Sequence, residues 1–251
     1  MDLPFGIDFG GSGIKGAAVD LEAGDFAAER VRIPTPQPST PAAVAQVLVA
    51  LLARFPESTG PVGVTVPAVV RHGVVGSAAN IDDTWVGTDA DALFTEATER
   101  DVHVVNDADA AGLAEVRYGA ARGRRGLVIV TTLGTGIGSA LVHDGVLVPN
   151  SELGHLEVEG HNAESRAANS AREREDLSME EWAGRLRTYY RTVEMLFSPD
   201  LFVVGGGISK QADEFLPLLG LDTEIVPAQL LNKAGIVGAA LYASLSHADG
   251  Q

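Results

Sequence analysis

The sequence predicts a mixed α/β protein built from two similar halves. Strand-like apolar segments stand in groups of two or three and alternate with helix-like segments, a pattern typical of this fold class. An apolar strand, a glycine-rich turn and a second strand occur in residues 6–20 and again in residues 129–145. This duplication predicts two similar domains, each presenting a glycine turn to one shared cleft.

The expected elements are short and follow one another closely. Strands are expected at residues 6–9, 14–20, 31–33, 61–67, 73–79, 102–106, 126–133, 137–143, 145–149, 201–206 and 224–228. Helices are expected at about 42–54, 89–99, 107–118, 162–175, 179–197 and 234–246. A third glycine cluster, Gly205 to Gly207, ends a strand and precedes a further helix.

Composition excludes several classes of protein. The 251 residues carry a formal net charge of −16, which argues against a general affinity for nucleic acid or membrane surfaces. No apolar run approaches the ~20 residues of a membrane helix, and no secretion signal is evident. The chain has no cysteine, so it has no disulfide framework or thiolate metal site, and a cytoplasmic setting is expected.

The first glycine turn, "DFGGSGIK" at residues 8–15, is predicted to hold phosphate. It has the spacing of neither a nucleotide-binding P-loop nor a dinucleotide fingerprint, and a strand follows it where those motifs need a helix. We expect Gly10, Gly11 and Gly13 to adopt positive φ and to bring their N–H groups close to an anion. On its own, the pattern fits an ordinary glycine-rich hairpin turn equally well.

Asn106 and Asp107 stand where a buried strand ends and a helix begins. Either residue is an ordinary helix N-cap, worth about 1 kcal/mol. A carboxylate at the carboxyl end of a strand is also where a general base for a hydroxyl nucleophile is needed. Asp109, further into the helix, is the better candidate for a purely structural role.

Glu152 and His155 form a second polar pair in "ELGH", residues 152–155. A carboxylate accepts hydrogen bonds from sugar hydroxyls, and an imidazole donates or accepts them. The same spacing suits a metal, but further ligands at fixed spacing are not evident in the sequence.

Together these segments resemble the ROK family of sugar kinases and repressors over nearly the whole chain. The glycine turn at 8–15 matches that family's first phosphate motif. Residues 133–140 match the second phosphate motif, 106–115 the catalytic segment, 152–155 the sugar-binding motif and 205–209 the nucleotide-side loop. The resemblance implies the actin/hexokinase/Hsp70-like ATPase fold, with duplicated ribonuclease H-like domains and an interdomain cleft. A repressor of this family would carry a DNA-binding helix-turn-helix before the first motif; because only seven residues precede Asp8, that function is not expected.

The segment after the sugar-binding motif lacks the cysteine-rich zinc loop of most members. In this the chain is similar to a zinc-free branch, the polyphosphate glucokinases. The resemblance implies phosphorylation of glucose at its 6-hydroxyl from inorganic polyphosphate, and also from ATP, with Mg²⁺ and without zinc. A strictly ATP-dependent kinase of glucose, mannose or an N-acetylated sugar is one alternative, and a non-catalytic sugar sensor is the other.

The resemblance also implies roles for individual residues. Asp107 is the expected base, and Asp8 the expected ligand of Mg²⁺, through water. The sugar is expected to contact Asn80, Asn106, Glu152, His155 and Glu164, with Trp85 nearby. The donor phosphates are expected to contact Gly10, Gly11, Lys15, Thr135, Gly136, Gly206 and Gly207.

Two further features bear on donor and sugar affinity. Arg122, Arg124, Arg125 and Lys210 would form a basic track for long polyphosphate, although a solvated loop at a helix end explains the same arginines. The family commonly has glycine where this chain has Ala68. If that position requires positive φ, alanine costs about 1 kcal/mol or shifts the loop.

The resemblance finally predicts two lobes and a homodimer. The smaller lobe covers residues 1–105 and is completed by the C-terminal helix near 235–246, and the larger lobe covers 106–234. Glucose is expected between the lobes, whose closure excludes water.

Overall fold

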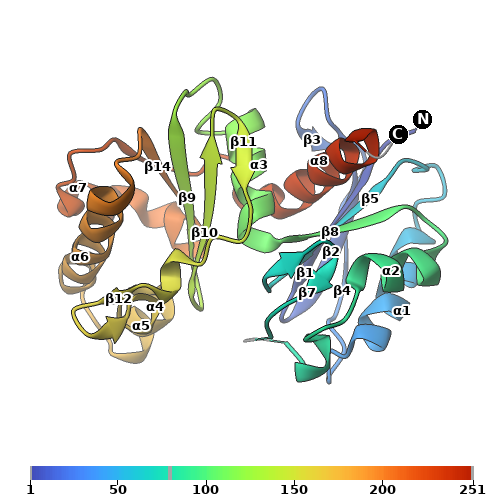
Figure 1. Cartoon of the computed structure of the whole chain (residues 1–251), viewed down its shortest axis with the longest axis horizontal. Helices are drawn as coiled ribbons and strands as arrows, with labels where there is room; N and C mark the ends of the chain where they lie inside the picture. Colours follow the sequence, from blue (N-terminus) through green and yellow to red (C-terminus); the bar gives the residue numbers. More distant parts are fainter. Residues whose placement is uncertain (1, 79–80, 250–251) are drawn as a thin grey trace. The chain divides into compact units, whose positions relative to one another are not determined.

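The structure, a computed structural model, describes residues 2–78 and 81–249. Two compact units make up the chain: Met1–Ala114 with Asn232–Gln251 form the first, and Glu115–Leu231 form the second. Each unit has its own sheet and apolar core (Figure 1). The division falls inside a helix, further along the chain than the boundary expected at residue 105.

The first unit is built on one mixed sheet. Its strands are β1 (Phe5–Gly10), β2 (Gly13–Asp20), β3 (Asp25–Phe26), β4 (Val31–Ile33), β5 (Val62–Val66) and β8 (Val102–Asn106). Their order is β3-β2-β1-β5-β8, with β4 paired to β2 outside this path. β1 runs antiparallel to β2 and parallel to β5, and β5 runs parallel to β8. A separate hairpin pairs β6 (Val70–Arg71) with β7 (Val74–Val75).

A C-terminal helix completes the first unit by packing closely on its sheet. The helices here are α1 (Pro41–Leu52), η1 (Asp83–Trp85), α2 (Ala90–Thr98) and α8 (Ala234–Asp249), while α3 (Asp107–Tyr118) and η4 (Leu231–Lys233) cross the division between the units. A Cβ atom at Gly6 or Gly63 would lie 1.9 or 1.8 Å from the main-chain oxygen of Ile236 or Ala239 on α8. Only glycine in β1 and β5 therefore permits this approach.

Trp85 belongs to the core of the first unit. Its side chain is fully buried, and its ring centroid lies 5.7 Å from that of Phe9 and 5.9 Å from that of Phe94. Its Nε1 donates a hydrogen bond to the carbonyl of Ser39 at 2.8 Å. Packing therefore accounts for Trp85, which has no surface left for the sugar expected near it. Asn80, expected beside that sugar, lies outside the described residues.

The second unit repeats the same strand pattern. Its strands are β9 (Leu127–Leu133), β10 (Ile137–His143), β11 (Val146–Val148), β14 (Leu201–Gly205) and β15 (Ile225–Pro227), in the order β11-β10-β9-β14-β15. β9 runs antiparallel to β10 and parallel to β14, which runs parallel to β15. An antiparallel hairpin continued by two parallel strands thus occurs in both units, which confirms the duplication predicted from the two glycine turns.

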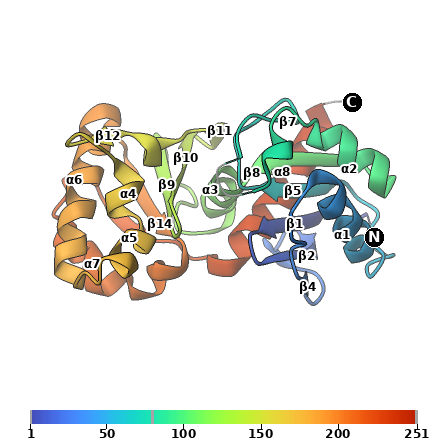
Figure 2. The ribbon, with the colours of Figure 1, turned by 90° about the horizontal axis from the view of Figure 1, so that it is seen from below.

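Helices cover one side of the second sheet. They are η2 (Leu153–His155), α4 (Ala163–Ala167), α5 (Asn169–Arg174), α6 (Met179–Phe197), η3 (Gly207–Gln211) and α7 (Ala212–Leu219), and a small hairpin pairs β12 (Glu157–Val158) with β13 (His161–Asn162). Figures 1 and 2 both place α6 and α7 on the same side of β9 and β14. The Nε1 of Trp182 on α6 donates to the carbonyl of Ala167 at 2.9 Å, which fixes α4 against α6.

Two expected elements differ from the structure. The single helix expected at 162–175 is two helices, because Ala168 adopts an extended conformation between α4 and α5. In the described part of the strand expected at 73–79, which ends at residue 78, only Val74–Val75 is a strand. Within residues 2–78 and 81–249, no helix combines the length and the apolar character needed to cross a membrane.

Candidate functional site

The first glycine turn closes the β1–β2 hairpin, in which Gly10 pairs with Gly13. Neither of these glycines nor Gly11 has φ in the left-handed range, so the expectation of positive φ is wrong. At position 13 a Cβ atom would lie 2.4 Å from Nε of Arg32, the far end of a flexible side chain. Arg32 in turn donates to the carbonyl of Ser12 at 2.6 Å. At Gly11 a Cβ atom would meet nothing within 4 Å, which leaves this main chain open to a ligand.

Asp8 stands beside this turn and is paired with Lys15. The two residues lie opposite each other in the hairpin, with 3.1 Å between Lys15 Nζ and Asp8 Oδ2. The Thr65 hydroxyl donates to the other carboxylate oxygen at 3.3 Å. The Asp8 side chain is 26% exposed, so it can also reach a hydrated cation. One accessible carboxylate suits Mg²⁺, which keeps several waters and shares its remaining positions with phosphates.

Asn106 is the N-cap of α3. Its Oδ1 accepts hydrogen bonds from the N–H groups of Ala108 at 2.8 Å and Asp109 at 3.1 Å, and its Nδ2 donates to the carbonyl of Ala68 at 3.0 Å. The N-cap interpretation therefore applies to Asn106, which is buried. Asp107, the first residue of α3, is exposed and presents its carboxylate at the helix N-terminus.

Ala68 is unstrained. It is not among the positive-φ positions of the described chain, and it is buried. Its N–H donates to the carbonyl of Val66 at 2.8 Å, while its own carbonyl accepts from Asn106. The cost considered for alanine at this position does not arise.

Three of the expected sugar-contacting residues come together in the second unit. His155 Nε2 lies 3.9 Å from Oε2 of Glu152, and His155 Nδ1 lies 3.6 Å from Oε1 of Glu164. Asn162, which the sequence did not single out, also approaches His155 Nδ1, at 3.1 Å. Burial raises the pKa of the Glu152 carboxyl; the His155 charge opposes this effect, and the Glu164 charge adds to it. We call Glu152, His155 and Glu164 the carboxylate–histidine cluster.

The second glycine turn, between β9 and β10, touches this cluster. The main-chain N–H of Ile137 donates to Oε2 of Glu164 at 3.1 Å, and a Cβ atom on Gly136 would lie 2.4 Å from the same oxygen. Ser170 on α5 donates its hydroxyl to the carbonyl of Thr135 at 2.5 Å. The helices after the cluster therefore brace the turn, and Glu164 links the two features. Neither Ser170 nor this link is visible in the sequence pattern.

The third glycine turn follows β14 and does require positive φ. Gly206 has φ 87°, and a Cβ atom there would lie 2.3 Å from the carbonyl oxygen of Leu133. The N–H and hydroxyl of Ser209 bind the Gly206 carbonyl at 3.2 and 2.8 Å. Gly207 is exposed with open space around it, and Lys210 is exposed on the same short helix.

The expected basic track is only partly available. Arg122 and Arg125 are exposed. Arg124 donates two hydrogen bonds to the carboxylate of Glu224, at 2.7 and 2.8 Å. This bidentate ion pair engages the guanidinium that the track would offer to phosphate.

Metal-ligating side chains do not cluster in the part of the chain that the structure describes. No three His, Cys, Asp or Glu side chains within residues 2–78 and 81–249 gather in a way that would hold a metal ion. Any cation at Asp8 would therefore depend on water and substrate for its other ligands.

Comparison with known proteins identifies the family. The ROK family model matches residues 4–169. The chain is 52% identical over 238 residues to the polyphosphate glucokinase of Mycobacterium tuberculosis (strain ATCC 25618 / H37Rv), a match that covers 94% of this chain and 89% of that protein. It is similar to the crystal structure of an inorganic polyphosphate/ATP-glucomannokinase from Arthrobacter sp. strain KM, with a TM-score of 0.93 and 57% identity over 98% of this chain and 100% of that one. A ROK family glucokinase from Streptomyces griseus, in complex with glucose and AMPPNP, gives a TM-score of 0.80 and 25% identity over 97% and 99% of the two chains. The chain belongs to the ROK family of proteins.

Proposed function

We propose that this chain is a glucokinase that phosphorylates the 6-hydroxyl of glucose from inorganic polyphosphate, and also from ATP. The observation that carries the proposal is the 52% identity to a polyphosphate glucokinase over 94% of the chain. Two local features support it: the exposed Asp107 at the start of α3, and the carboxylate–histidine cluster. A pure sugar sensor needs neither a base nor two phosphate-binding turns.

In the proposed reaction Asp107 is the general base. Its carboxylate accepts the proton of the 6-hydroxyl as that oxygen forms a bond to the terminal phosphorus of the donor. The bond between this phosphorus and the bridging oxygen breaks, and the shortened polyphosphate or ADP leaves with the electron pair. Asp107 is exposed, so a sugar hydroxyl can approach its carboxylate.

The sugar is held by acceptors and an imidazole. Glu152 and Glu164 accept hydrogen bonds from sugar hydroxyls, and His155 donates or accepts one. Asn106 uses one amide hydrogen on Ala68 and keeps the second for the sugar. Asn80 is proposed as a further sugar contact from the family resemblance alone.

The donor phosphates are held mainly by main-chain N–H groups of the glycine turns. Gly11 and Gly207 leave open space for this contact. Gly10, Lys15, Thr135, Gly136 and Gly206 are proposed to complete the set. Asp8 would hold Mg²⁺ through water, and the ion, when bound, offsets the charge of the donor phosphates.

The test is a direct assay. The purified protein is given glucose, Mg²⁺ and either polyphosphate or ATP, and glucose 6-phosphate is measured. Product with polyphosphate supports the proposal, product with ATP alone favours the strictly ATP-dependent kinase, and silence with both donors overturns the kinase function. Because a structurally similar protein is named a glucomannokinase, mannose is the second sugar to assay.

We also propose a cytoplasmic homodimer. The acidic, cysteine-free composition supports the cytoplasmic setting, and the family resemblance supports the dimer. Light scattering tests the assembly: twice the chain mass of 26.1 kDa is expected, and the mass of a single chain would contradict it.

A further inference from the structure

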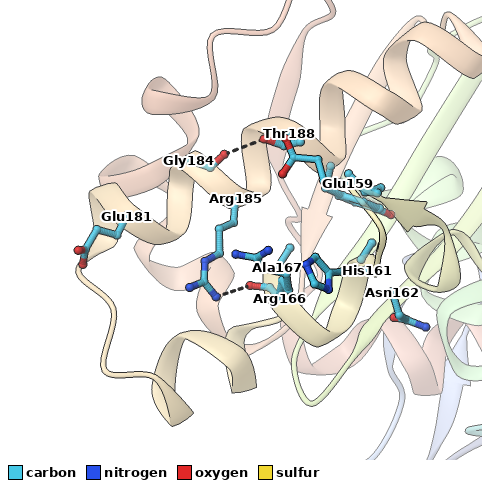
Figure 3. A pocket seen from close by; sticks show the side chains of 12 residues that line it. Glu159, His161, Asn162, Arg166, Ala167, Glu181, Gly184, Arg185 and Thr188 are labelled. Carbon is cyan, nitrogen blue, oxygen red and sulfur yellow. Dashed lines mark hydrogen bonds between the residues drawn. The ribbon is translucent and has the colours of Figure 1, made fainter.

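A pocket that the proposed reaction does not use lies within the second unit. It is bordered by the β12–β13 hairpin, by α4 and by α6, and it has a volume of about 190 Å³ (Figure 3). Most sites for drug-sized molecules measure about 300–1,000 Å³, so this one suits a smaller ligand. Its walls combine apolar atoms with several charged side chains.

Two arginines and a histidine dominate one end of the pocket. Figure 3 shows the side chains of Arg166, Arg185 and His161 turned toward the same region. Arg166 makes no ion pair with any residue that the structure describes, although the chain carries a net charge of −16. Arg185 Nη1 donates to the carbonyl of Arg166 at 3.3 Å and lies 2.7 Å from a carboxylate oxygen of Glu175. These contacts fix the Arg185 guanidinium next to Arg166.

The acidic residues near the two arginines interact with Arg185 and form no ion pair with Arg166 among the described residues. Glu181 is engaged in the N-cap of α6, where its carboxylate accepts from the N–H of Ser178 at 2.9 Å. That hydrogen bond lowers the pKa of Glu181, as expected for a carboxylate already provided with a donor. Figure 3 draws Glu159 toward the Thr188 end of the pocket, away from the two arginines. Arg185 is already paired with Glu175, so Arg166 is the arginine at this end that is available to an anion.

Tyr189 lines the pocket, and its buried hydroxyl lacks an acceptor in the described part of the chain. Tyr189 is 1% exposed, and its hydroxyl forms no hydrogen bond with any described residue. The adjacent Tyr190 differs, since its hydroxyl lies 2.6 Å from that of Thr131. Burial raises the pKa of Tyr189, so its hydroxyl keeps its proton and is a donor. A buried donor without an acceptor is unfavourable, and an anionic oxygen that reached this hydroxyl would supply one.

The pocket shares an element with the carboxylate–histidine cluster. Arg166 and Glu164 both belong to α4, a helix of five residues. Glu164 reaches His155 and the N–H of Ile137, while Asn162, which lines the pocket, reaches His155. A ligand that moves α4 would therefore move the groups proposed to hold the sugar.

We propose that this pocket binds a small phosphate-bearing anion, inorganic phosphate or a phosphate monoester, on Arg166, with Arg185 beside it, and that its occupancy changes glucose affinity through α4. A guanidinium group matches phosphate oxygens in a planar, two-donor arrangement, so Arg166 provides both charge and orientation. The binding part of the proposal stands on this pocket alone. The effect on glucose rests on the proposed function.

Titration calorimetry with inorganic phosphate and, separately, glucose 6-phosphate tests the binding. The wild-type protein, R166Q and the control R54Q are compared; Arg54 is an exposed arginine of the first unit. The glycine turns would also bind phosphate, so the isotherm should contain more than one binding component. We expect R166Q to weaken the affinity of one component at least tenfold and R54Q to leave it unchanged. The ligand that shows this component more strongly identifies the natural class of anion. Equal isotherms for R166Q and R54Q with both ligands overturn the proposal.

Y189F provides a second variant that keeps the core volume. It should weaken the same component several-fold while leaving the melting temperature equal or higher, because the variant removes an unpaired buried hydroxyl. If Y189F binds phosphate as tightly as the wild type does, the Tyr189 hydroxyl is not part of the proposed site. The KM for glucose should also change with phosphate concentration in wild type and R54Q but not in R166Q. If phosphate binds on Arg166 but the protein shows no kinase activity, the binding site stands and the proposed function is wrong. If the protein is an active kinase but its phosphate binding does not depend on Arg166, the proposed function stands and the binding site is wrong.

Discussion

The carboxylate of Glu164 accepts a hydrogen bond from the main-chain N–H of Ile137, with 3.1 Å between oxygen and nitrogen. The same carboxylate approaches His155 with its other oxygen, at 3.6 Å. One side chain thus joins the second glycine turn to the cluster proposed to hold the sugar. A change at Glu164 should therefore affect donor and sugar together.

Replacing Glu164 separates its two contacts. E164A removes both, and loss of the hydrogen bond to the turn, worth about 1 kcal/mol, should raise the KM for polyphosphate and for ATP about fivefold. E164Q keeps an acceptor for Ile137 but loses the charge beside His155, so it should raise the KM for glucose more than that for either donor. Steady-state kinetics with each substrate varied in turn measures this difference. Identical KM changes in the two variants would contradict the linking role.

Asp107→Asn should abolish turnover while sparing glucose binding. A general base contributes about 10²- to 10⁴-fold to the rate, and asparagine keeps an oxygen at the helix N-terminus but cannot take the proton. The expected kcat is therefore at least a hundredfold lower, with the Kd for glucose from calorimetry within a factor of about three. Asp222→Asn, at another exposed aspartate, serves as the matched control and should retain full activity. A D107N enzyme with normal kcat would exclude Asp107 as the base.

The sequence predicted the outline of the fold, and the structure supplied the reasons for several residues. The two glycine turns sufficed to predict the duplication, because a hairpin depends on residues close together in the chain. The positive φ expected at Gly10, Gly11 and Gly13 is not observed, and the side chain that approaches Gly13, Arg32, lies on another strand. No local pattern reports such a contact.

The sequence pattern also could not predict the contacts within the candidate site. The break at Ala168 allows Ser170 to donate to Thr135, so a tertiary contact overrides a helical pattern. Glu164 reaches His155 because Trp182 fixes α4 by a hydrogen bond to Ala167. The motifs therefore identified which side chains to consider, while their mutual contacts depended on the packing of distant segments.

Glucose affinity should depend on pH through Glu152. Burial raises the pKa of this carboxyl above the usual 4.5, so it takes up a proton at a higher pH in the folded protein than in the unfolded chain. The free energy of unfolding therefore falls as the pH rises from the pKa of Glu152 in the unfolded chain through its pKa in the folded protein, because burial disfavours the ionised carboxylate. Sugar binding has the opposite dependence, since the ionised carboxylate is the acceptor: the KM for glucose should rise as the pH falls toward the raised pKa.

E152Q provides the check on both trends. It should remove the pH dependence of the KM in this acidic range, weaken glucose binding, and leave the melting temperature at pH 7 equal or higher. Glu157→Gln, at an exposed glutamate of β12, is the matched control and should keep the wild-type profile. An E152Q enzyme with an unchanged pH profile would assign the titration to another group.

Ala68→Gly should lower stability without improving the enzyme. Because Ala68 does not adopt positive φ, glycine relieves no strain and only adds conformational freedom to the unfolded chain. The free energy of unfolding should fall by about 0.4–1 kcal/mol in urea titrations. The carbonyl that accepts from Asn106 is retained in the variant, so the KM for glucose should stay within a factor of about two. A marked gain in glucose affinity would show that the loop does need glycine.

The effect of each loop arginine on polyphosphate binding should depend on whether its guanidinium is already paired. Arg122 and Arg125 are exposed, whereas Arg124 is paired with Glu224 through two hydrogen bonds. If these residues guide a long phosphate chain, R122Q/R125Q should raise the KM for long polyphosphate several-fold and leave the KM for ATP nearly unchanged, because ATP is too short to reach beyond its own site. R124Q should have the smaller effect, since its guanidinium is already engaged. Steady-state kinetics with long polyphosphate, short polyphosphate and ATP measure these effects, with R54Q as the control. Equal changes of the KM for long polyphosphate and for ATP would show that these arginines only belong to a solvated loop.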